Sequence, residues 1–321
     1  MRDHGGNIDW AMARFGAGDW VDLSTGINRR PYPMPALTTA DLRGLPTRAA
    51  QEALLATARR AWRVAPGFAG VALAGAQAAI QLLPWTMPGR GRARILTPTY
   101  NEHAACLRNA GWAVDTVSDP AGLAGADLAI VVNPNNPDGR CHRPEALLAM
   151  AGHVGALVVD ESFADPQPDL SLLPHPPAGN VLVLRSFGKF YGLAGLRLGF
   201  AFGAGERIAA LSAMAGPWPV SGPAIAAGQA ALSDAGWAEA MARQLRQDAE
   251  RADALARGAG WAVLGGTPLF RLYDTPDAAA AQERLARHHV WSRIFPYSDR
   301  WLRLGLPGPE AEWDRLQQAL A

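Results

Sequence analysis

Short apolar segments alternate with stretches rich in Ala, Leu and Arg through the first two thirds of this 321-residue chain. Six apolar segments have the length of strands, at residues 71–74, 93–97, 127–132, 156–160, 181–184 and 198–202. Helical segments lie between several of them, at residues 76–83, 102–109 and 144–152. Strands that alternate with helices are typical of a mainly parallel sheet covered on both faces. The sequence therefore predicts a doubly wound α/β fold.

The character of the sequence changes after Pro217 and Pro219. A long helical stretch at residues 223–257 leads to weaker strand candidates at 261–264 and 269–272. The first residues are rich in Gly and Pro and are expected to form an extended arm. At about 150 residues per domain, 321 residues predict about two domains, and the arm is a third part of the chain. The three predicted parts are an arm (1–34) that contributes to a substrate site and a dimer, a large domain (35–219), and a smaller α+β domain (220–321).

The charge balance argues against two classes of partner. Lys and Arg number 30 and Asp and Glu number 29, which leaves no basic surface for nucleic acid or an anionic membrane. No apolar segment reaches the roughly 18 residues of a membrane helix, so a cytoplasmic protein is expected. The two cysteines, Cys106 and Cys141, are far apart and predict neither a disulfide framework nor a metal site.

Lys189 is the only lysine in the chain, whereas 29 positions carry Arg. A bias that replaces Lys with Arg explains the other positions but makes this one informative. An amine of pKa about 10.4 can be deprotonated by its surroundings, whereas Arg effectively cannot. Schiff-base formation is the leading interpretation, with chance survival of one Lys as the alternative.

Open α/β sheets bind ligands beyond the carboxyl ends of their strands. The first strand leads into Gly75, Ala76 and Gln77 at the start of a helix, where backbone N–H groups can bind a phosphate, although many strand-to-helix turns look similar. The next strand leads to Tyr100, which could stack on a flat ring or pack in the core.

Polar residues also follow the later strands. Asn136 lies in a turn rich in Asn and Pro, and Asp160 ends an apolar strand where a buried carboxylate needs a partner. The following strand leads to Ser186 and Lys189, with Arg197 eight residues further on. Neither a G-x-G-x-x-G nor a Walker A sequence occurs, which argues against nicotinamide and nucleotide binding.

Residues 186–199 read Ser-Phe-Gly-Lys-Phe-Tyr-Gly-Leu-Ala-Gly-Leu-Arg-Leu-Gly. This segment resembles the pyridoxal-phosphate attachment site of the class I/II aminotransferases, the fold-type I enzymes. The resemblance extends in the same order to Asn136, Asp160 and residues 302–305, and so covers nearly the whole chain.

The resemblance implies a role for each residue of the predicted cofactor site. Lys189 would bind pyridoxal 5'-phosphate as a Schiff base, and Asp160 would pair with the pyridine nitrogen and keep it protonated. Asn136 would donate to the phenolic oxygen, and Tyr100 would stack on the ring. The cofactor phosphate would be bound by Gly75, Ala76, Gln77, Ser186 and Arg197. Arg303 would bind the substrate carboxylate, and the chain would form a homodimer.

Two positions depart from the family pattern. Phe163 stands three residues after Asp160, where many relatives carry a Tyr that donates to the phenolic oxygen. Leu45 stands where many relatives carry a Tyr that reaches the phosphate in the neighbouring subunit. The resemblance is therefore weaker for these two contacts.

The N-terminal segment is similar to a branch of the family that decarboxylates a phosphorylated amino acid in cobalamin biosynthesis. The similarity lies in His4-Gly5-Gly6-Asn7 and in residues 22–28, 292–295 and 301–307. It implies that His4 and Asn28 bind the substrate phosphate and that Arg293 supports the anionic end. The alternatives are that His4 is a disordered terminal residue and that Arg293 lies on the surface.

The predicted function is thus a pyridoxal-phosphate-dependent decarboxylase, a lyase, that acts on a small phosphorylated amino acid. An aminotransferase that takes a phosphorylated substrate such as histidinol phosphate is the alternative. A cofactor-binding protein with a regulatory role comes third, because the predicted lysine, aspartate and arginines are all present.

Overall fold

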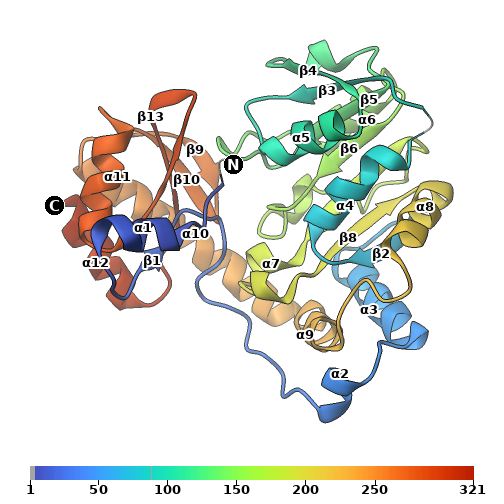
Figure 1. Ribbon diagram of the computed structural model, residues 1–321, viewed down its shortest axis with the longest axis horizontal. Coiled ribbons are helices and arrows are strands. Elements are labelled where there is room, and N and C mark those ends of the chain that lie inside the picture. Colours follow the sequence, from blue (N-terminus) through green and yellow to red (C-terminus); the bar gives the residue numbers. More distant parts are fainter. Residues whose placement is uncertain (1–3, 88) are drawn as a thin grey trace.

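The computed structural model describes residues 4–87 and 89–321, and its largest element is a seven-stranded sheet (Figure 1). The strands are β2 (Ala69–Leu73), β3 (Arg92–Leu96), β4 (Ala113–Val117), β5 (Leu128–Val132), β6 (Leu157–Asp160), β7 (Val181–Ser186) and β8 (Gly199–Gly203). Their order is β2-β8-β7-β6-β5-β3-β4, and only β8 runs antiparallel to its neighbours. The predicted mainly parallel α/β fold is confirmed, with the six predicted strands within two residues of their expected ends.

Successive residues of the central strands belong to two separate hydrophobic clusters. On β7, Val181 and Val183 join one cluster, whereas Leu182 and Leu184 join the other. Helices α3 (Arg48–Ala61), α6 (Pro144–Ala151) and α9 (Gly222–Ser233) pack in the first cluster. Helices α4 (Ala76–Leu82), α5 (Asn101–Asn109) and α8 (Gly205–Ala215) pack in the second. Because strand side chains alternate in direction, both faces of the sheet are covered.

The C-terminal third builds a four-stranded antiparallel sheet in the order β12-β13-β10-β9. Its strands are β9 (Ala262–Thr267), β10 (Phe270–Asp274), β12 (Arg293–Phe295) and β13 (Ser298–Gly305). Helices α10 (Ala235–Gly258), α11 (Ala278–Arg287) and α12 (Glu310–Leu320) pack beside it. The shorter elements are α2 (Thr39–Arg43), α7 (Phe187–Phe190), η1 (Leu83–Trp85), η2 (Pro120–Leu123), η3 (Pro168–Leu170) and η4 (Ala194–Leu196).

Two sequence-based expectations about these elements were wrong. The stretch at 223–257 forms two helices, because the Asp234 side chain accepts a hydrogen bond from the Trp237 backbone and begins α10 there. Strand β4 was not predicted, since it lies at the edge of the sheet and most of its side chains are half-buried or exposed.

The first residues also differ from the expected extended arm. Residues Ile8–Phe15 form helix α1, and Ala11 packs in a small cluster with Ala286 and Trp291. Strand β1 (Val21–Asp22) pairs in parallel with β11 (Val290–Trp291). Figure 1 accordingly shows the N-terminal segment lying beside the C-terminal elements. The predicted division at residues 34 and 219 stays a prediction.

Among the described helices, none is at once long enough and apolar enough to span a membrane.

Candidate active site

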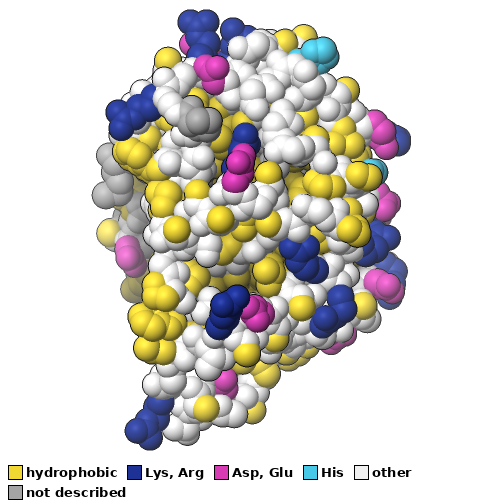
Figure 2. All heavy atoms as spheres, turned by 90° about the vertical axis from the view of Figure 1, so that its right-hand side faces the viewer, with side chains coloured by type: hydrophobic (Ala, Val, Ile, Leu, Met, Phe, Trp, Pro, Cys, Tyr) yellow, Lys and Arg dark blue, Asp and Glu magenta, His cyan; other side chains and the backbone are white. Residues whose placement is uncertain are grey.

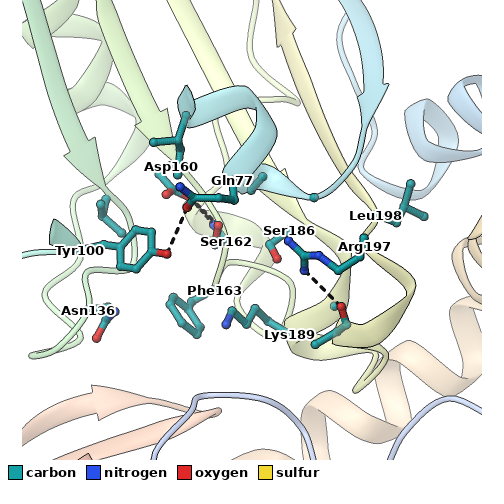
Figure 3. A pocket seen from close by; sticks show the side chains of 16 residues that line it. Gln77, Tyr100, Asn136, Asp160, Ser162, Phe163, Ser186, Lys189, Arg197 and Leu198 are labelled. Atoms are coloured by element: carbon teal, nitrogen blue, oxygen red, sulfur yellow. Dashed lines mark hydrogen bonds between the residues drawn. The ribbon is translucent and has the colours of Figure 1, made fainter. Parts of the chain in front are cut away.

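A cavity of about 180 Å³ opens at the carboxyl ends of the central strands. The nine residues that the sequence predicts for the cofactor all line it: Gly75, Ala76, Gln77, Tyr100, Asn136, Asp160, Ser186, Lys189 and Arg197. Figure 3 shows Lys189 and Phe163 pointing into the space between Tyr100 and Arg197. The structure therefore brings together residues that are spread over more than a hundred positions of the sequence.

Lys189 lies in the short helix α7, directly after β7. Burial lowers the pKa of its amine to about 8, and the nearby charges of Arg303 and Arg197 act in the same direction, opposed by Asp160. The amine Nζ lies 5.8 Å from the centre of the Phe163 ring. About a tenth of this amine is therefore uncharged at pH 7, far more than for an exposed lysine, and the uncharged form is the nucleophile.

Asp160 ends β6 and is only 2% exposed. Its Oδ2 accepts from Nε2 of buried His103 at 2.9 Å, and its Oδ1 accepts from the Ser162 backbone and hydroxyl. Burial alone would raise the pKa of Asp160, but these hydrogen bonds outweigh it and hold the pKa below its usual value. The cavity therefore contains a fixed carboxylate that stays charged.

The turn before α4 is packed against an arginine. Gly75 has φ +82°, and a Cβ at this position would lie 2.8 Å from Nη2 of Arg197. A Cβ on Gly199 would lie 2.3 Å from the Ala76 backbone nitrogen, so glycine is required at both points. Arg197 itself has φ +53°, an uncommon conformation for a residue with a side chain. Backbone N–H groups and one guanidinium thus meet in a space that fits an anion.

Tyr100 belongs to a directional chain of hydrogen bonds. Its hydroxyl lies 3.1 Å from Oε1 of Gln77, and Nε2 of Gln77 donates to Glu102 at 3.0 Å (Figure 3 shows the first of these bonds). Because a carboxylate only accepts, Glu102 orients the amide and makes the Tyr100 hydroxyl the donor. Burial, followed by the charge of Glu102, raises the pKa of Tyr100 to about 12, so the ring stays uncharged.

Asn136 is paired with Arg303 from β13. The Arg303 guanidinium donates to Oδ1 of Asn136 and, at 2.6 Å, to the Ser24 carbonyl. Burial and the neighbouring charge of Arg293 lower the pKa of Arg303 to about 10, so it remains a cation at neutral pH. Since Oδ1 of Asn136 accepts from Arg303, the amide nitrogen is the group that can donate to a ligand.

A second cavity, of about 300 Å³, adjoins the first and shares Tyr100, Asn136, Phe163 and Lys189 with it. Three of the four predicted substrate residues line it: His4, Arg293 and Arg303. Lys189 therefore faces both the predicted cofactor space and a space that is bordered by cationic side chains.

Asn28, the fourth predicted substrate residue, is placed elsewhere. It is buried, and its side chain donates to the Phe190 carbonyl and accepts from the Arg30 backbone, each at 2.9 Å. Its backbone N–H donates to the Lys189 carbonyl. The amide nitrogen and the backbone N–H of Asn28 thus support the segment that carries Lys189, the amide oxygen is used by Arg30, and the residue lines neither cavity.

The two departures from the family pattern have different surroundings. Phe163 lines both cavities and packs edge-on against Phe270 from β10. Leu45 is 65% exposed and precedes α3. An apolar ring therefore replaces a hydroxyl donor beside Lys189, whereas Leu45 lies on the surface of this chain.

Sequence reasoning missed His103 and Glu102. Both lie on the first turn of α5, directly after Tyr100. Residues three apart on a helix share a face, so His103 could have been expected beside Tyr100, whose ring it contacts edge-on. No motif pointed to Glu102, because its partners His4 and Gln77 come from distant segments.

The donor set fits a phosphorylated pyridine aldehyde. It offers a buried amine of lowered pKa, a fixed carboxylate, an amide donor and an anion-binding turn with Arg197. Within residues 4–87 and 89–321, no cluster of His, Cys, Asp and Glu is suited to a metal ion.

A family model described as "Aminotransferase class I and II" matches residues 45–320, and the chain belongs to this family. Two curated relatives named threonine-phosphate decarboxylase are similar over their full length. The protein from a Sinorhizobium species is 44% identical over 99% of this chain and 97% of its own. The protein from Pseudomonas aeruginosa is 41% identical over 100% and 97%. A histidinol-phosphate aminotransferase from Sinorhizobium meliloti, solved in complex with pyridoxal-5'-phosphate, superimposes with a TM-score of 0.81 at 20% identity, over 97% of this chain and 92% of that one.

Proposed function

We propose that this protein is a pyridoxal-phosphate-dependent decarboxylase that converts L-threonine O-3-phosphate to 1-aminopropan-2-yl phosphate and CO2. The two curated relatives with this activity in their names, at 44% and 41% identity, support the substrate. The structural observation that carries the proposal is the position of Lys189, which lines both the cofactor-like cavity and the cavity bordered by His4, Arg293 and Arg303.

Nine residues are proposed to bind the cofactor. Lys189 would carry it covalently, Asp160 would pair with its ring nitrogen, Asn136 would donate to its phenolic oxygen and Tyr100 would lie on its ring. The turn of Gly75, Ala76 and Gln77, with Ser186 and Arg197, would bind its phosphate. Bound pyridoxal phosphate supplies a sink for the electron pair that is left at the substrate Cα.

The substrate carries an anion at each end, and the cavity offers a cation for each. Arg303 would bind the carboxylate, because its planar donors bind such groups in pairs. His4 and Arg293 would bind the phosphate. Two fixed ends set the rotation of the substrate about Cα, and this rotation decides whether the bond to the carboxylate or the bond to hydrogen is cleaved.

Lys189 would also supply the proton that the reaction needs. When CO2 leaves, the electron pair of the broken bond remains at Cα, and a proton must replace the carboxylate. The amine of Lys189 borders the substrate cavity, and its pKa of about 8 is close to the working pH of a general acid. The Phe163 ring, whose centre lies 5.8 Å from this amine, would present an apolar surface to the same space.

Product analysis tests the proposal directly. The holoprotein is incubated with threonine phosphate, with and without 2-oxoglutarate, and CO2 and the phosphorylated product are measured. We expect CO2 and aminopropanol phosphate without added 2-oxoglutarate. Amino transfer from threonine phosphate or histidinol phosphate that requires 2-oxoglutarate would support the aminotransferase alternative. That alternative is supported by a curated relative from Mycobacterium tuberculosis named histidinol-phosphate aminotransferase, which is 33% identical over 72% of this chain.

We further propose that the protein is a cytoplasmic homodimer, and that nucleic acid and membranes are not its partners. Figure 2 shows hydrophobic side chains spread among charged ones over the face that lies on the right of Figure 1. The exposed large side chains Leu42, Leu45, Met214 and Trp218 belong to segments around α2 and α8. Exposed apolar side chains in such numbers favour contact with a second protein surface.

A further inference from the structure

Glu102 is a buried carboxylate whose partner His4 lines the substrate cavity. Its side chain is 8% exposed, and its Oε1 accepts from Nε2 of His4 at 3.0 Å. We propose that Glu102 is a positioning residue that holds His4 as a phosphate-binding cation. Recognition of the phosphorylated substrate then depends on Glu102 as well as on His4. This inference rests on the proposed function.

The backbone next to His4 is fixed from the other side of the cavity. The Gly6 N–H donates to Oγ of Ser24 at 2.7 Å, and a Cβ on Gly5 would lie 2.4 Å from the Ser24 carbonyl oxygen. That carbonyl also accepts from Arg303. The His4 backbone is thus tied to the residues around Arg303, while its side chain reaches α5. On α5, Glu102 accepts the hydrogen bond from the His4 ring.

The chemistry of imidazole explains what this contact does. A neutral imidazole donates from one ring nitrogen only. Since Glu102 can only accept, Nε2 of His4 must donate to it. A His4 side chain that also donates from Nδ1 to a phosphate must therefore carry a proton on both ring nitrogens. His4 is 40% exposed and lines the cavity, so its ring is accessible to a substrate.

When His4 is removed, the same carboxylate is expected to weaken binding of the phosphorylated substrate. A buried negative charge near the phosphate site repels the substrate unless a cation stands between them. Glu102 should therefore favour phosphate binding in the presence of His4 and oppose it in its absence. A residue that only stabilises the fold has no reason to change sign in this way.

Glu102 also accepts from Gln77, which lines the proposed cofactor cavity. A substitution could thus disturb the cofactor as well as the substrate. Glu102→Gln has the same shape and keeps one carbonyl oxygen as an acceptor. The absorbance spectrum of the holoprotein reports whether the cofactor environment is intact, and it is expected to be nearly unchanged.

The experiment is a double-mutant cycle of Glu102→Gln and His4→Ala, read by calorimetric binding and by KM and kcat. The phosphorylated ligands are threonine phosphate and histidinol phosphate, and each is compared with its unphosphorylated form. Glu145→Gln is the matched control, because Glu145 is likewise the second residue of a helix, α6, but is exposed outside both cavities. Turnover of threonine phosphate by the parent protein tests the proposed function separately, without reference to Glu102.

We expect Glu102→Gln to weaken binding of the phosphorylated ligand about tenfold, with kcat and the unphosphorylated ligand little changed. In the His4→Ala background the same substitution should leave binding unchanged or improve it. Equal losses for both forms of the ligand would overturn the proposal. So would losses that simply multiply in the double variant, since they would show that the two residues act independently.

Discussion

Nε2 of His103 lies 2.9 Å from Oδ2 of Asp160, and both side chains are buried at the carboxyl end of β6. Asp160 is the carboxylate proposed to pair with the cofactor ring nitrogen. Burial raises the pKa of Asp160, and the hydrogen bond and charge of His103, with the hydrogen bonds of Ser162, lower it. His103 therefore helps to keep Asp160 charged, as the proposed pairing with the cofactor ring nitrogen requires, even though His103 lines neither cavity.

Replacement of His103 should weaken catalysis through Asp160. His103→Phe removes the N–H donor, and the pKa of Asp160 should rise. We expect a loss of about 1.5 to 3 kcal/mol in kcat/KM, the range for a hydrogen bond to a charged group. The pH titration of the cofactor absorbance should shift in the same variant. His103→Gln, which keeps an N–H donor, should lose less, and equal losses for both variants would argue for a packing role.

Covalent attachment should occur at one position only. Borohydride reduction of the yellow holoprotein, followed by peptide mapping, should place the cofactor on Lys189. Since the chain has no other lysine, Lys189→Ala should carry no side-chain adduct. A side-chain adduct that persists in this variant would contradict the assignment.

Cofactor uptake should depend on pH through Lys189. Only the uncharged amine attacks an aldehyde, and its pKa is about 8. The rate at which the cofactor-free protein takes up pyridoxal phosphate should rise about tenfold per pH unit below that value and level off above it. Arg303→Met removes a nearby positive charge, so the pKa should rise and the plateau should move to higher pH. A plateau that stays in place would show that the charge of Arg303 does not act on the amine.

His4 and Asn28 should behave differently when each is replaced by Ala. His4→Ala should cost about 1 to 3 kcal/mol in binding of threonine phosphate and leave threonine almost unaffected. Asn28→Ala removes bonds to the Phe190 carbonyl and the Arg30 backbone, so it should lower activity towards both ligands. Selective loss of the phosphorylated ligand in Asn28→Ala would restore its predicted role as a direct phosphate ligand.

The proposed homodimer should be visible by sedimentation at micromolar concentration. Trp218 is 55% exposed, and Trp218→Glu places a charge among the exposed apolar side chains around α2 and α8. We expect this variant to dissociate more readily than the parent. Leu264→Glu, on strand β9, is the control and should remain associated. A parent protein that is monomeric and fully active would refute the dimer.

Much of the fold and of the cofactor cavity could be predicted from the sequence because local patterns carry them. The apolar strands are short and buried, and the residues that follow them meet at one sheet edge by topology alone. Strand β4 was not predicted because its side chains are half-buried or exposed. Helix α1 was not predicted because the Gly-rich residues around it suggested an irregular segment.

The predicted cofactor residues line one cavity, but the hydrogen bonds between distant segments could not be predicted from the sequence. The pairs His103–Asp160 and His4–Glu102 join residues 57 and 98 positions apart. Asn28 had the right residue type for a phosphate ligand, but its amide nitrogen donates to the Phe190 carbonyl and its amide oxygen accepts from the Arg30 backbone. Such choices depend on three-dimensional neighbours that no local pattern records.

The pairing of β1 with β11 also has a consequence for biosynthesis. A ribosome releases Val21 long before Val290, so the first strand has no partner until nearly the whole chain has been made. Lys189 and the large sheet can assemble earlier. The cavity that contains both His4 and Arg303 can be completed only when the two ends of the chain meet. A chain that is cut short before Arg303 during translation would therefore lack the substrate site even where its central sheet had formed, which ties substrate recognition to synthesis of the C-terminal sheet.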